Sequence, residues 1–206
     1  MSSGRAYRRR ARVDRSTATR DRILQAVRAL LAEGTFHEST MAQVAARAEV
    51  SRATLYQHFR SRVELVDAMC DTFAKNPALR ELRETVRLDD PTAAVARTID
   101  GSIRFWSSED PVLRELYGVA AIDPAAQALV DRQRADRRSE LERLVQNLRR
   151  AGRLAGAASQ KRALNLLLVL TSYETYRELR EAGLSDKQAI ALLQEAATVL
   201  LTRSAV

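Results

Sequence analysis

Apolar residues recur about every three to four positions along most of the chain, which is the pattern of amphipathic helices. In the first such stretch, Ile23, Val27 and Leu31 share one helical face between about Ser16 and Ala32. Gly34 follows directly, at a place where a helix of this kind usually ends. The pattern predicts a nearly all-helical protein whose first helix covers residues 16–32.

Three short helices are predicted next, and each begins at a hydroxyl residue that can cap it. Thr40 and Gln43 form a T-x-x-Q capping box for a helix that ends near Ala48. Ser51 and Ser61 are placed to cap the third and fourth helices. Two short helices joined by a tight turn, behind a packing helix, form a helix-turn-helix pattern.

The later helix starts are marked by proline, because every proline in the chain follows Asn or Asp. An Asx N-cap followed by proline at the first helical position suits a helix start. The chain has four such pairs: Asn76-Pro77, Asp90-Pro91, Asp110-Pro111 and Asp123-Pro124. They predict helices near 77–87, 91–108, 110–120 and 123–151, respectively. Two strongly apolar helices follow, at about 159–182 and from Ser185 onward.

These elements predict an all-α fold with a three-helix, N-terminal helix-turn-helix domain and a larger helical domain behind it, about nine to ten helices in all. The predicted domains are a basic flexible arm over 1–15, a helix-turn-helix domain over 16–62, and a larger helical domain over 63–206. The single cysteine excludes an intrachain disulfide, and only two histidines accompany it. We therefore expect no metal and no cofactor.

The positive charge is confined to the first third of the chain. Residues 1–62 hold 13 Arg and 5 acidic residues, whereas residues 63–206 hold 21 basic and 21 acidic residues. A basic run is often a plain solvated face, but segregation of this kind points to a polyanionic partner. The arm residues expected to contact that partner are Arg8, Arg9, Arg10 and Arg12. Double-stranded DNA is the predicted partner, because a membrane-bound helix needs an apolar face that this arm lacks.

No apolar stretch is long enough to span a bilayer, and no apolar segment follows the Arg-rich N-terminus as a secretory signal requires. The sequence thus predicts a cytoplasmic protein without a membrane partner.

The residues of the helix-turn-helix pattern carry a family resemblance. Positions 39–65 read STMAQVAARAEVSRATLYQHFRSRVEL. This stretch resembles the DNA-binding domain of TetR/AcrR-family transcriptional regulators, over about Thr17 to Leu65. One position departs from the family pattern. Glu49 stands where the family commonly has glycine in the turn, and a positive φ there would strain a residue with a side chain.

The resemblance implies that nine positions form the DNA-binding surface: Thr40, Ser51, Arg52, Ala53, Thr54, Tyr56, Gln57, His58 and Arg62. It implies that Thr40 and Arg62 approach phosphates. It places the recognition helix over 51–58, with Tyr56 and His58 at the backbone or sugar. It places Arg52, Ala53, Thr54 and Gln57 toward base edges.

The chemistry of the residues fits this interpretation. Arg52, near the start of a groove-entering helix, suits a bidentate contact to guanine, although a plain phosphate contact suits it equally well. Ala53 and the Thr54 methyl group suit thymine methyls. Leu55 and Phe59 are expected in the core.

The penultimate helix is apolar nearly all round between Leu164 and Leu170, so it needs cover on two sides. A second subunit is the expected cover, which predicts a homodimer; the alternative is that the last helices only complete a monomer core. The resemblance also implies an effector pocket, and its candidate lining is Met69, Phe73, Ile103, Trp106, Tyr117, Leu166, Tyr173 and Tyr176.

The predicted function is a homodimeric repressor that a small apolar effector releases from a palindromic operator. A ligand-independent regulator, an activator of the same fold and a basic architectural DNA-binding protein are the alternatives. No GxSxG, P-loop or HExxH motif is present, so an enzyme is not expected.

Overall fold

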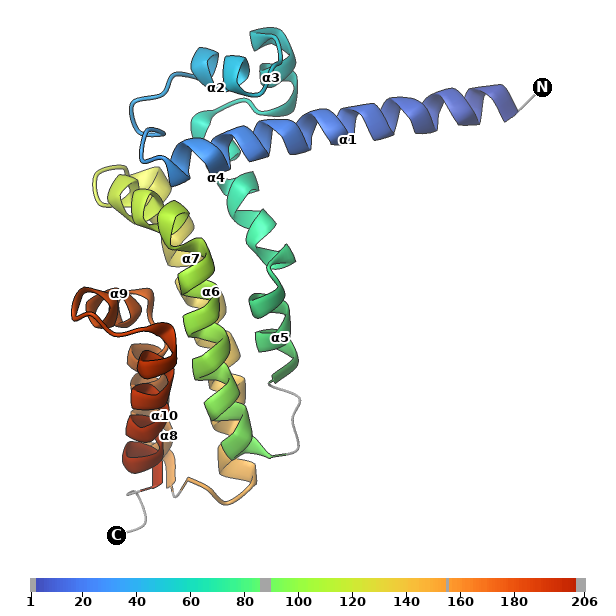
Figure 1. The fold of residues 1–206 in the computed structure, drawn as a ribbon. Helices are drawn as coiled ribbons and strands as arrows, with labels where there is room; N and C mark the ends of the chain where they lie inside the picture. Colours follow the sequence, from blue (N-terminus) through green and yellow to red (C-terminus); the bar gives the residue numbers. More distant parts are fainter. Residues whose placement is uncertain (1–2, 86–89, 155, 203–206) are drawn as a thin grey trace. The chain divides into compact units, whose positions relative to one another are not determined.

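The computed structural model describes residues 3–85, 90–154 and 156–202 (Figure 1). Every regular element in these ranges is a helix. The helices are α1 (Ser3–Ala32), α2 (Met41–Arg47), α3 (Arg52–His58), α4 (Arg62–Cys70), the 3-10 helix η1 (Asp71–Lys75), α5 (Pro77–Thr85), α6 (Pro91–Ala120), α7 (Pro124–Arg150), α8 (Gly156–Leu170), α9 (Tyr173–Glu181) and α10 (Asp186–Thr202). Within the described ranges, none of these helices combines the length and the apolar character that crossing a membrane requires.

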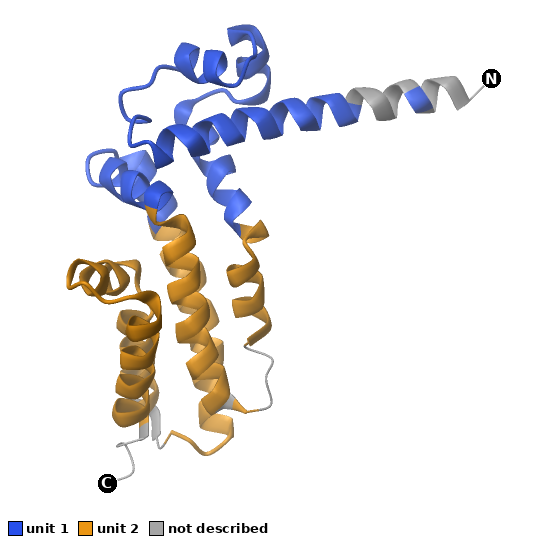
Figure 2. Ribbon diagram, viewed as in Figure 1, with its two compact units in different colours: residues 1–73, 111–130 blue, residues 74–110, 131–206 orange. Residues whose placement is uncertain are grey.

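The chain forms two compact units (Figure 2). Unit 1 contains residues 1–73 and 111–130, and unit 2 contains residues 74–110 and 131–206. The division differs from the predicted boundary after residue 62, because α4 and the segment 111–130 group with the helix-turn-helix. Helix α6 therefore begins in unit 2 and ends in unit 1.

The core of unit 1 is built on one face of α1, which packs against α2 and α4, while α2 packs against α3. Ile23 and Leu31 of α1 are completely buried, as is Leu65 of α4. Leu55 and Phe59 have 0% and 1% of their surfaces exposed, which confirms both as core residues. Burial of each such side chain contributes about 1.5–3 kcal/mol to folding.

Helix α1 is longer than the sequence predicted. It begins at Ser3 instead of near Ser16, so the predicted helix start is wrong and the stretch expected to be a flexible arm is helical from Ser3 onward. Arg and Ala, which dominate this stretch, are strong helix formers, and no proline interrupts them. The missing apolar stripe did not exclude a helix here, and the two described apolar side chains of this stretch, Tyr7 and Val13, are exposed.

The predicted caps of the short helices are confirmed. Thr40 and Gln43 form a reciprocal capping box on α2. The hydroxyls of Ser51 and Ser61 accept from the third backbone N–H beyond them, at 3.0 Å and 3.1 Å. Each bond satisfies a donor that a helix start leaves unpaired.

Three of the four Asx-Pro starts are also confirmed. The side chains of Asn76, Asp90 and Asp123 accept from the N–H two residues onward at 2.8–2.9 Å. The fourth prediction is wrong, because Pro111 lies inside α6 rather than at a helix start. The ring of Pro111 is exposed, while Val112 beside it is buried, so packing of the apolar face holds the helix together across the proline.

The predicted helix over 159–182 is two helices, α8 and α9, separated at Thr171 and Ser172. The Thr171 hydroxyl donates to the carbonyl of Leu167, and the Ser172 hydroxyl accepts from the N–H of Thr175 at 3.0 Å. Ser and Thr side chains compete in this way with backbone bonds and favour helix ends. The apolar pattern continues across the break and conceals it.

Unit 2 buries apolar side chains from α6, α7 and α8. Ile99, Ile103, Leu144 and Leu167 are its largest fully buried residues. Helix α10 packs against α8 and α9. Its Ala189 and Ala197 are buried, and such small side chains permit a close approach of the helices.

Candidate nucleic-acid interface

The turn between α2 and α3 has the geometry of a Schellman cap. The N–H of Val50 donates to the carbonyl of Ala45, and the N–H of Glu49 donates to that of Ala46. Glu49 has a φ of +53°, the left-handed conformation expected at this cap position. The prediction of a positive φ at Glu49 is thereby confirmed, and the turn keeps its form without glycine.

We expect Glu49→Gly to stabilise the protein by about 0.5–1 kcal/mol. The left-handed conformation costs a residue with a side chain about 1–2 kcal/mol, and glycine removes this cost. The greater conformational freedom of glycine in the unfolded chain offsets part of the stabilisation. Urea unfolding measures the difference. Glu49→Gln is the matched control: it keeps the strain, so its unfolding free energy should stay near that of the parent. A destabilised glycine variant would contradict strain at this turn.

Helix α3 presents a polar face to solvent and an apolar face to the core. Arg52, Ala53, Tyr56 and Gln57 are exposed, and Thr54 and His58 are half-buried. The Thr54 hydroxyl lies 2.8 Å from that of Ser51. The six predicted base- and backbone-contacting residues of α3 therefore lie on one short helix around an exposed face.

Thr40 lies at the N-terminus of α2, where the resemblance implies a phosphate contact. Its hydroxyl donates to the Gln43 side chain at 2.8 Å and accepts from the Gln43 N–H at 3.3 Å. Both residues are exposed. The N-terminus of a helix carries unpaired N–H groups and a partial positive charge, which favour an anion.

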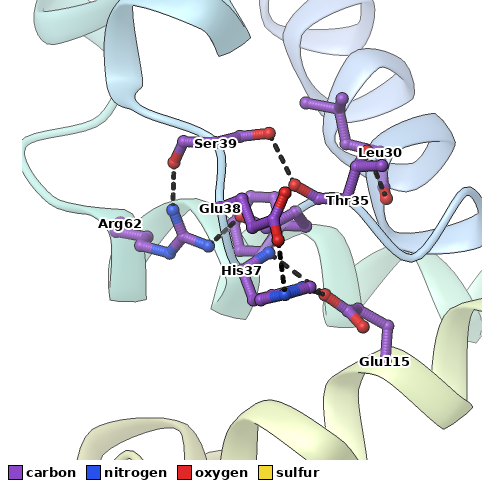
Figure 3. A network of polar contacts seen from close by, with 8 residues as sticks. Leu30, Thr35, His37, Glu38, Ser39, Arg62 and Glu115 are labelled. Atoms are coloured by element: carbon purple, nitrogen blue, oxygen red, sulfur yellow. Dashed lines mark hydrogen bonds and ion pairs between the residues drawn. The ribbon is translucent and has the colours of Figure 1, made fainter.

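Arg62, the residue expected at a phosphate, instead points into unit 1 (Figure 3). Its guanidinium donates to the carbonyls of Ser39 and Phe36 in the loop between α1 and α2. The guanidinium carbon also lies 3.9 Å from the centre of the Phe36 ring, a cation–π distance. Burial lowers the pKa of Arg62, and Asp123 and Glu115 act against that shift. Arg62 thus joins α4 to the loop that precedes Thr40.

A second link joins this loop to the last part of α6. The backbone N–H and the ring Nδ1 of His37 lie 3.0 Å and 2.7 Å from one carboxylate oxygen of Glu115 (Figure 3). Glu38 lies 3.5 Å from the other ring nitrogen. The hydrogen bond to Glu115 raises the pKa of His37. Both residues belong to unit 1, so the segment 111–120 is fastened to the helix-turn-helix by a titratable pair.

We expect the stability of the protein to fall as the pH rises through the near-neutral range. The pKa of His37 is raised in the folded state, so its contribution is complete below the ordinary value near 6.5. The contribution is lost as the pH passes the raised value. Urea midpoints measured across about pH 5.5–8.5 test this, and Glu115→Gln should flatten the dependence. An unchanged profile in that variant would assign the dependence to other groups.

The predicted arm contacts fall on side chains outside the described part of the structure. Helix α1 includes the backbone of these residues, which are Arg8, Arg9, Arg10 and Arg12. Their role in binding DNA stays a prediction.

The predicted pocket residues are divided between the two units. Met69, Phe73 and Tyr117 belong to unit 1, and the other five belong to unit 2. Leu166 is half-buried and lines a shallow surface hollow together with Val169, whose exposed fraction is 61%. Leu166 therefore lies on the outward side of α8, away from the buried Leu167.

The structure does bring together the aromatic residues of unit 2. The Trp106 ring lies 4.9 Å from that of Phe105 and 5.6 Å from that of Tyr173, which in turn stacks on Tyr176. The indole N–H of Trp106 donates to the carbonyl of Thr171 at 3.0 Å. The hydroxyl of Tyr173 donates to Asp110 at 2.7 Å. These rings form a packed cluster with satisfied polar groups.

Two features of unit 1 were not predicted from the sequence. The inward position of Arg62 depends on Phe36, and His37 meets Glu115 across 78 positions of the chain. Neither pair has a local sequence signal.

Comparison with known proteins agrees with this geometry. Residues 23–69 match the tetR family of bacterial regulatory proteins. No curated protein sequence matches the chain significantly. Among solved structures, a transcriptional regulator from Rhodococcus sp. Rha1 matches with a TM-score of 0.68 and 19% identity, over 91% of this chain and 98% of the other.

Two further structures show the same fold. The TetR-family regulator PfmR from Thermus thermophilus has a TM-score of 0.61 and 21% identity, over 88% of this chain and 95% of its own. The complex of SmeT with triclosan has a TM-score of 0.63 and 19% identity, over 88% and 90%. The predicted all-helical fold and the family resemblance are both confirmed. The chain shares its fold with solved TetR-family regulators, and its residues 23–69 match the tetR family.

Proposed function

We propose that this chain, which has a TetR-family DNA-binding domain and the TetR-family fold, is a homodimeric repressor that a small molecule releases from a palindromic operator. The observation that carries the proposal is the α2–turn–α3 geometry. Helix α3 is capped at Ser51, held by the buried Leu55, and exposes Arg52 and Gln57. A rigid helix with this polar face is suited to enter the major groove.

The charge distribution supports DNA as the partner. The net charge of +8 lies entirely within residues 1–62, and the arginine-rich stretch at the start of the chain is part of helix α1. Cations on the binding domain neutralise phosphates and make DNA affinity strongly dependent on salt. Arg8, Arg9, Arg10 and Arg12 are proposed to make these contacts along the helix.

The outward faces of α8 and α10 support a dimer. Val169 on α8 and Leu192 and Val199 on α10 are 61%, 45% and 42% exposed. Leu166 lies on the same side of α8 as Val169. Because α8 and α10 pack against each other, these residues leave an apolar surface that one chain does not cover. A second copy of the chain is the proposed cover.

Two observations support a small-molecule effector. The helical body over residues 63–206 holds 21 basic and 21 acidic residues and so has no charge surplus to bind DNA. SmeT, which shares the fold, has been solved with triclosan. The proposal keeps four of the predicted pocket residues as the apolar lining of an effector pocket in unit 2: Ile103, Trp106, Tyr173 and Tyr176.

Selection from a pool of random duplexes with the full-length protein tests the proposed function. The expected result is enrichment of an inverted repeat whose half-sites lie about one helical turn apart, or a multiple of it. Recovery of DNA with no common sequence would instead describe an architectural protein held by charge alone.

We expect Arg52→Ala to lose about 1–3 kcal/mol of discrimination at one base position in each half-site. The exposed Arg52 side chain near the start of α3 is the residue best placed for a bidentate guanine contact. Repeating the selection with the variant measures this loss position by position. Arg60→Ala, which removes an exposed arginine outside α3, should leave the base preferences unchanged. If Arg52→Ala also leaves them unchanged, Arg52 contacts only phosphate.

A further inference from the structure

The inward position of Arg62 removes the cation that the family resemblance implies at a phosphate. Its guanidinium is bound to the carbonyls of Phe36 and Ser39, so it is not presented to a duplex that α3 enters. A recognition helix is held in register by contacts from neighbouring side chains to the phosphates. In this chain that contact falls to another basic side chain of unit 1.

Arg20 of α1 lies at the C-terminal end of α3. Its guanidinium carbon is 5.0 Å from the centre of the Phe59 ring, which is a cation–π distance. Phe59 is the residue that ends α3, and its N–H still donates to the carbonyl of Leu55. Only 1% of Phe59 is exposed, whereas Arg20 is exposed. The guanidinium therefore covers the buried ring from the solvent side.

The same end of α3 carries the two residues expected at the DNA backbone. The ring of His58 lies 6.4 Å from that of Phe59, and Tyr56 is exposed. The last carbonyl groups of a helix carry a partial negative charge, which repels phosphate. The positive charge of Arg20 offsets this repulsion where the backbone contacts are expected.

The contacts of Arg20 leave its hydrogen-bond donors available to an anion. Among the described residues, Arg20 has no carboxylate partner, whereas Arg47 at the end of α2 is paired with Glu33. Stacking on a ring occupies the flat face of a guanidinium, but its N–H groups point outward in the plane. The stack on Phe59 thus restricts the position of the guanidinium without using its donors.

We propose that Arg20 is a phosphate-binding residue of the DNA interface, set in place by Phe59, and that it makes the contact expected of Arg62. This proposal rests on the proposed function and adds to it a residue of α1 beyond the arm over 1–15. A planar guanidinium can donate two parallel N–H bonds to one phosphate. Such a contact fixes the register of α3 in the groove without reading sequence.

The salt dependence of DNA affinity tests the proposal, with the full-length protein and the duplex selected from the random pool. The slope of log affinity against log salt concentration is about −0.9 for each phosphate that a cation neutralises. Arg20→Ala removes one contact per protomer, so the slope for a dimer should become shallower by about 2. The affinity should fall about 10- to 100-fold at 0.1 M salt, and the loss should shrink as the salt concentration rises.

A purely structural role for Arg20 predicts a different pattern. Loss of support for Phe59 alone would weaken binding by the same factor at every salt concentration and leave the slope unchanged. Arg20→Lys keeps the charge but not the planar group, so it should retain most of the parent's slope. Urea unfolding of both variants verifies that they are folded under the conditions of the binding measurement.

Arg22→Ala is the matched control. Arg22 is an exposed arginine of the same helix, and two positions along an α-helix place it about 160° around the axis from Arg20. Both alanine variants change the net charge equally, so only the position of the lost charge differs. Arg22→Ala should keep the parent's slope.

Uncharged methylphosphonate groups at single positions of the selected duplex locate the contact. One position in each half-site should weaken binding of the parent and have no effect on Arg20→Ala, because that variant no longer contacts the replaced phosphate.

The proposal is overturned if Arg20→Ala keeps the parent's slope, if Arg22→Ala lowers the slope as much, or if no phosphate replacement distinguishes Arg20→Ala from the parent. In each of these cases the parent still binds its selected inverted repeat, so the proposed function stands. If the parent selects no common sequence, the proposed function fails, and the proposal fails with it.

Discussion

Replacing Val169 with glutamate is expected to convert a dimer into a monomer and to abolish tight operator binding with it. Val169 is the most exposed apolar residue of α8, and it lies beside Leu166 on the outward face. In a two-fold interface each substitution occurs twice, so two carboxylates would be buried near each other. Such an arrangement costs several kcal/mol and should weaken the dimer by about 100-fold or more. Light scattering at micromolar concentration should report about 23.0 kDa for the variant and about twice that for the parent.

A matched control is available on the same chain. Ile122 is an apolar residue with 82% of its surface exposed, and it belongs to unit 1. Ile122→Glu therefore makes the same kind of change on a different helical unit and should leave the dimer intact. Leu192→Glu on α10 should act like Val169→Glu. If both of these interface variants remain dimeric, the subunits meet elsewhere.

Replacing Arg62 with alanine is expected to cost about 2–4 kcal/mol of stability and to weaken DNA binding indirectly. The guanidinium supplies hydrogen bonds to two loop carbonyls and covers the Phe36 ring, of which only 1% is exposed. Removing it leaves partly buried carbonyls without a donor, and each such group costs about 1–3 kcal/mol. Urea unfolding should show the loss, and amide exchange should rise over residues 36–40. Thr40 then loses its fixed position at the start of α2.

Two comparisons separate this positioning role from a phosphate contact. Arg62→Lys keeps the charge but not the fork of donors, so it should recover less than half of the lost stability. Arg60→Ala removes a nearby exposed arginine and should leave the unfolding free energy nearly unchanged. If Arg62→Ala keeps the parent's stability and instead lowers the salt dependence of DNA binding, Arg62 contacts phosphate.

Local signals in the sequence were sufficient for the parts of the fold that depend on neighbouring residues. The Thr40–Gln43 capping box and the Ser51 cap both rest on groups within a few positions of each other. The positive φ at Glu49 was expected from the family resemblance, because the family commonly has glycine at that position. Hydrophobic spacing likewise identified Leu55 and Phe59 as core residues. For these features, the residues that form each cap or core position lie close together in the sequence.

Features that depend on residues far apart in the sequence could not be predicted from local signals. Pro111 remains inside α6 because residues from elsewhere in the chain bury the apolar face beside it. Arg62 was assigned outward because its partner Phe36 and its acceptor Ser39 precede it by more than twenty positions.

Footprinting of the selected duplex at single-nucleotide resolution, combined with the mass of the complex, tests the central claim most directly. A dimeric regulator predicts two protomers on one duplex, with protection that is symmetric about the centre of the inverted repeat and that disappears in Val169→Glu. Specific protection of a single half-site by one protomer, with affinity equal to that of the whole repeat, would contradict a dimeric regulator.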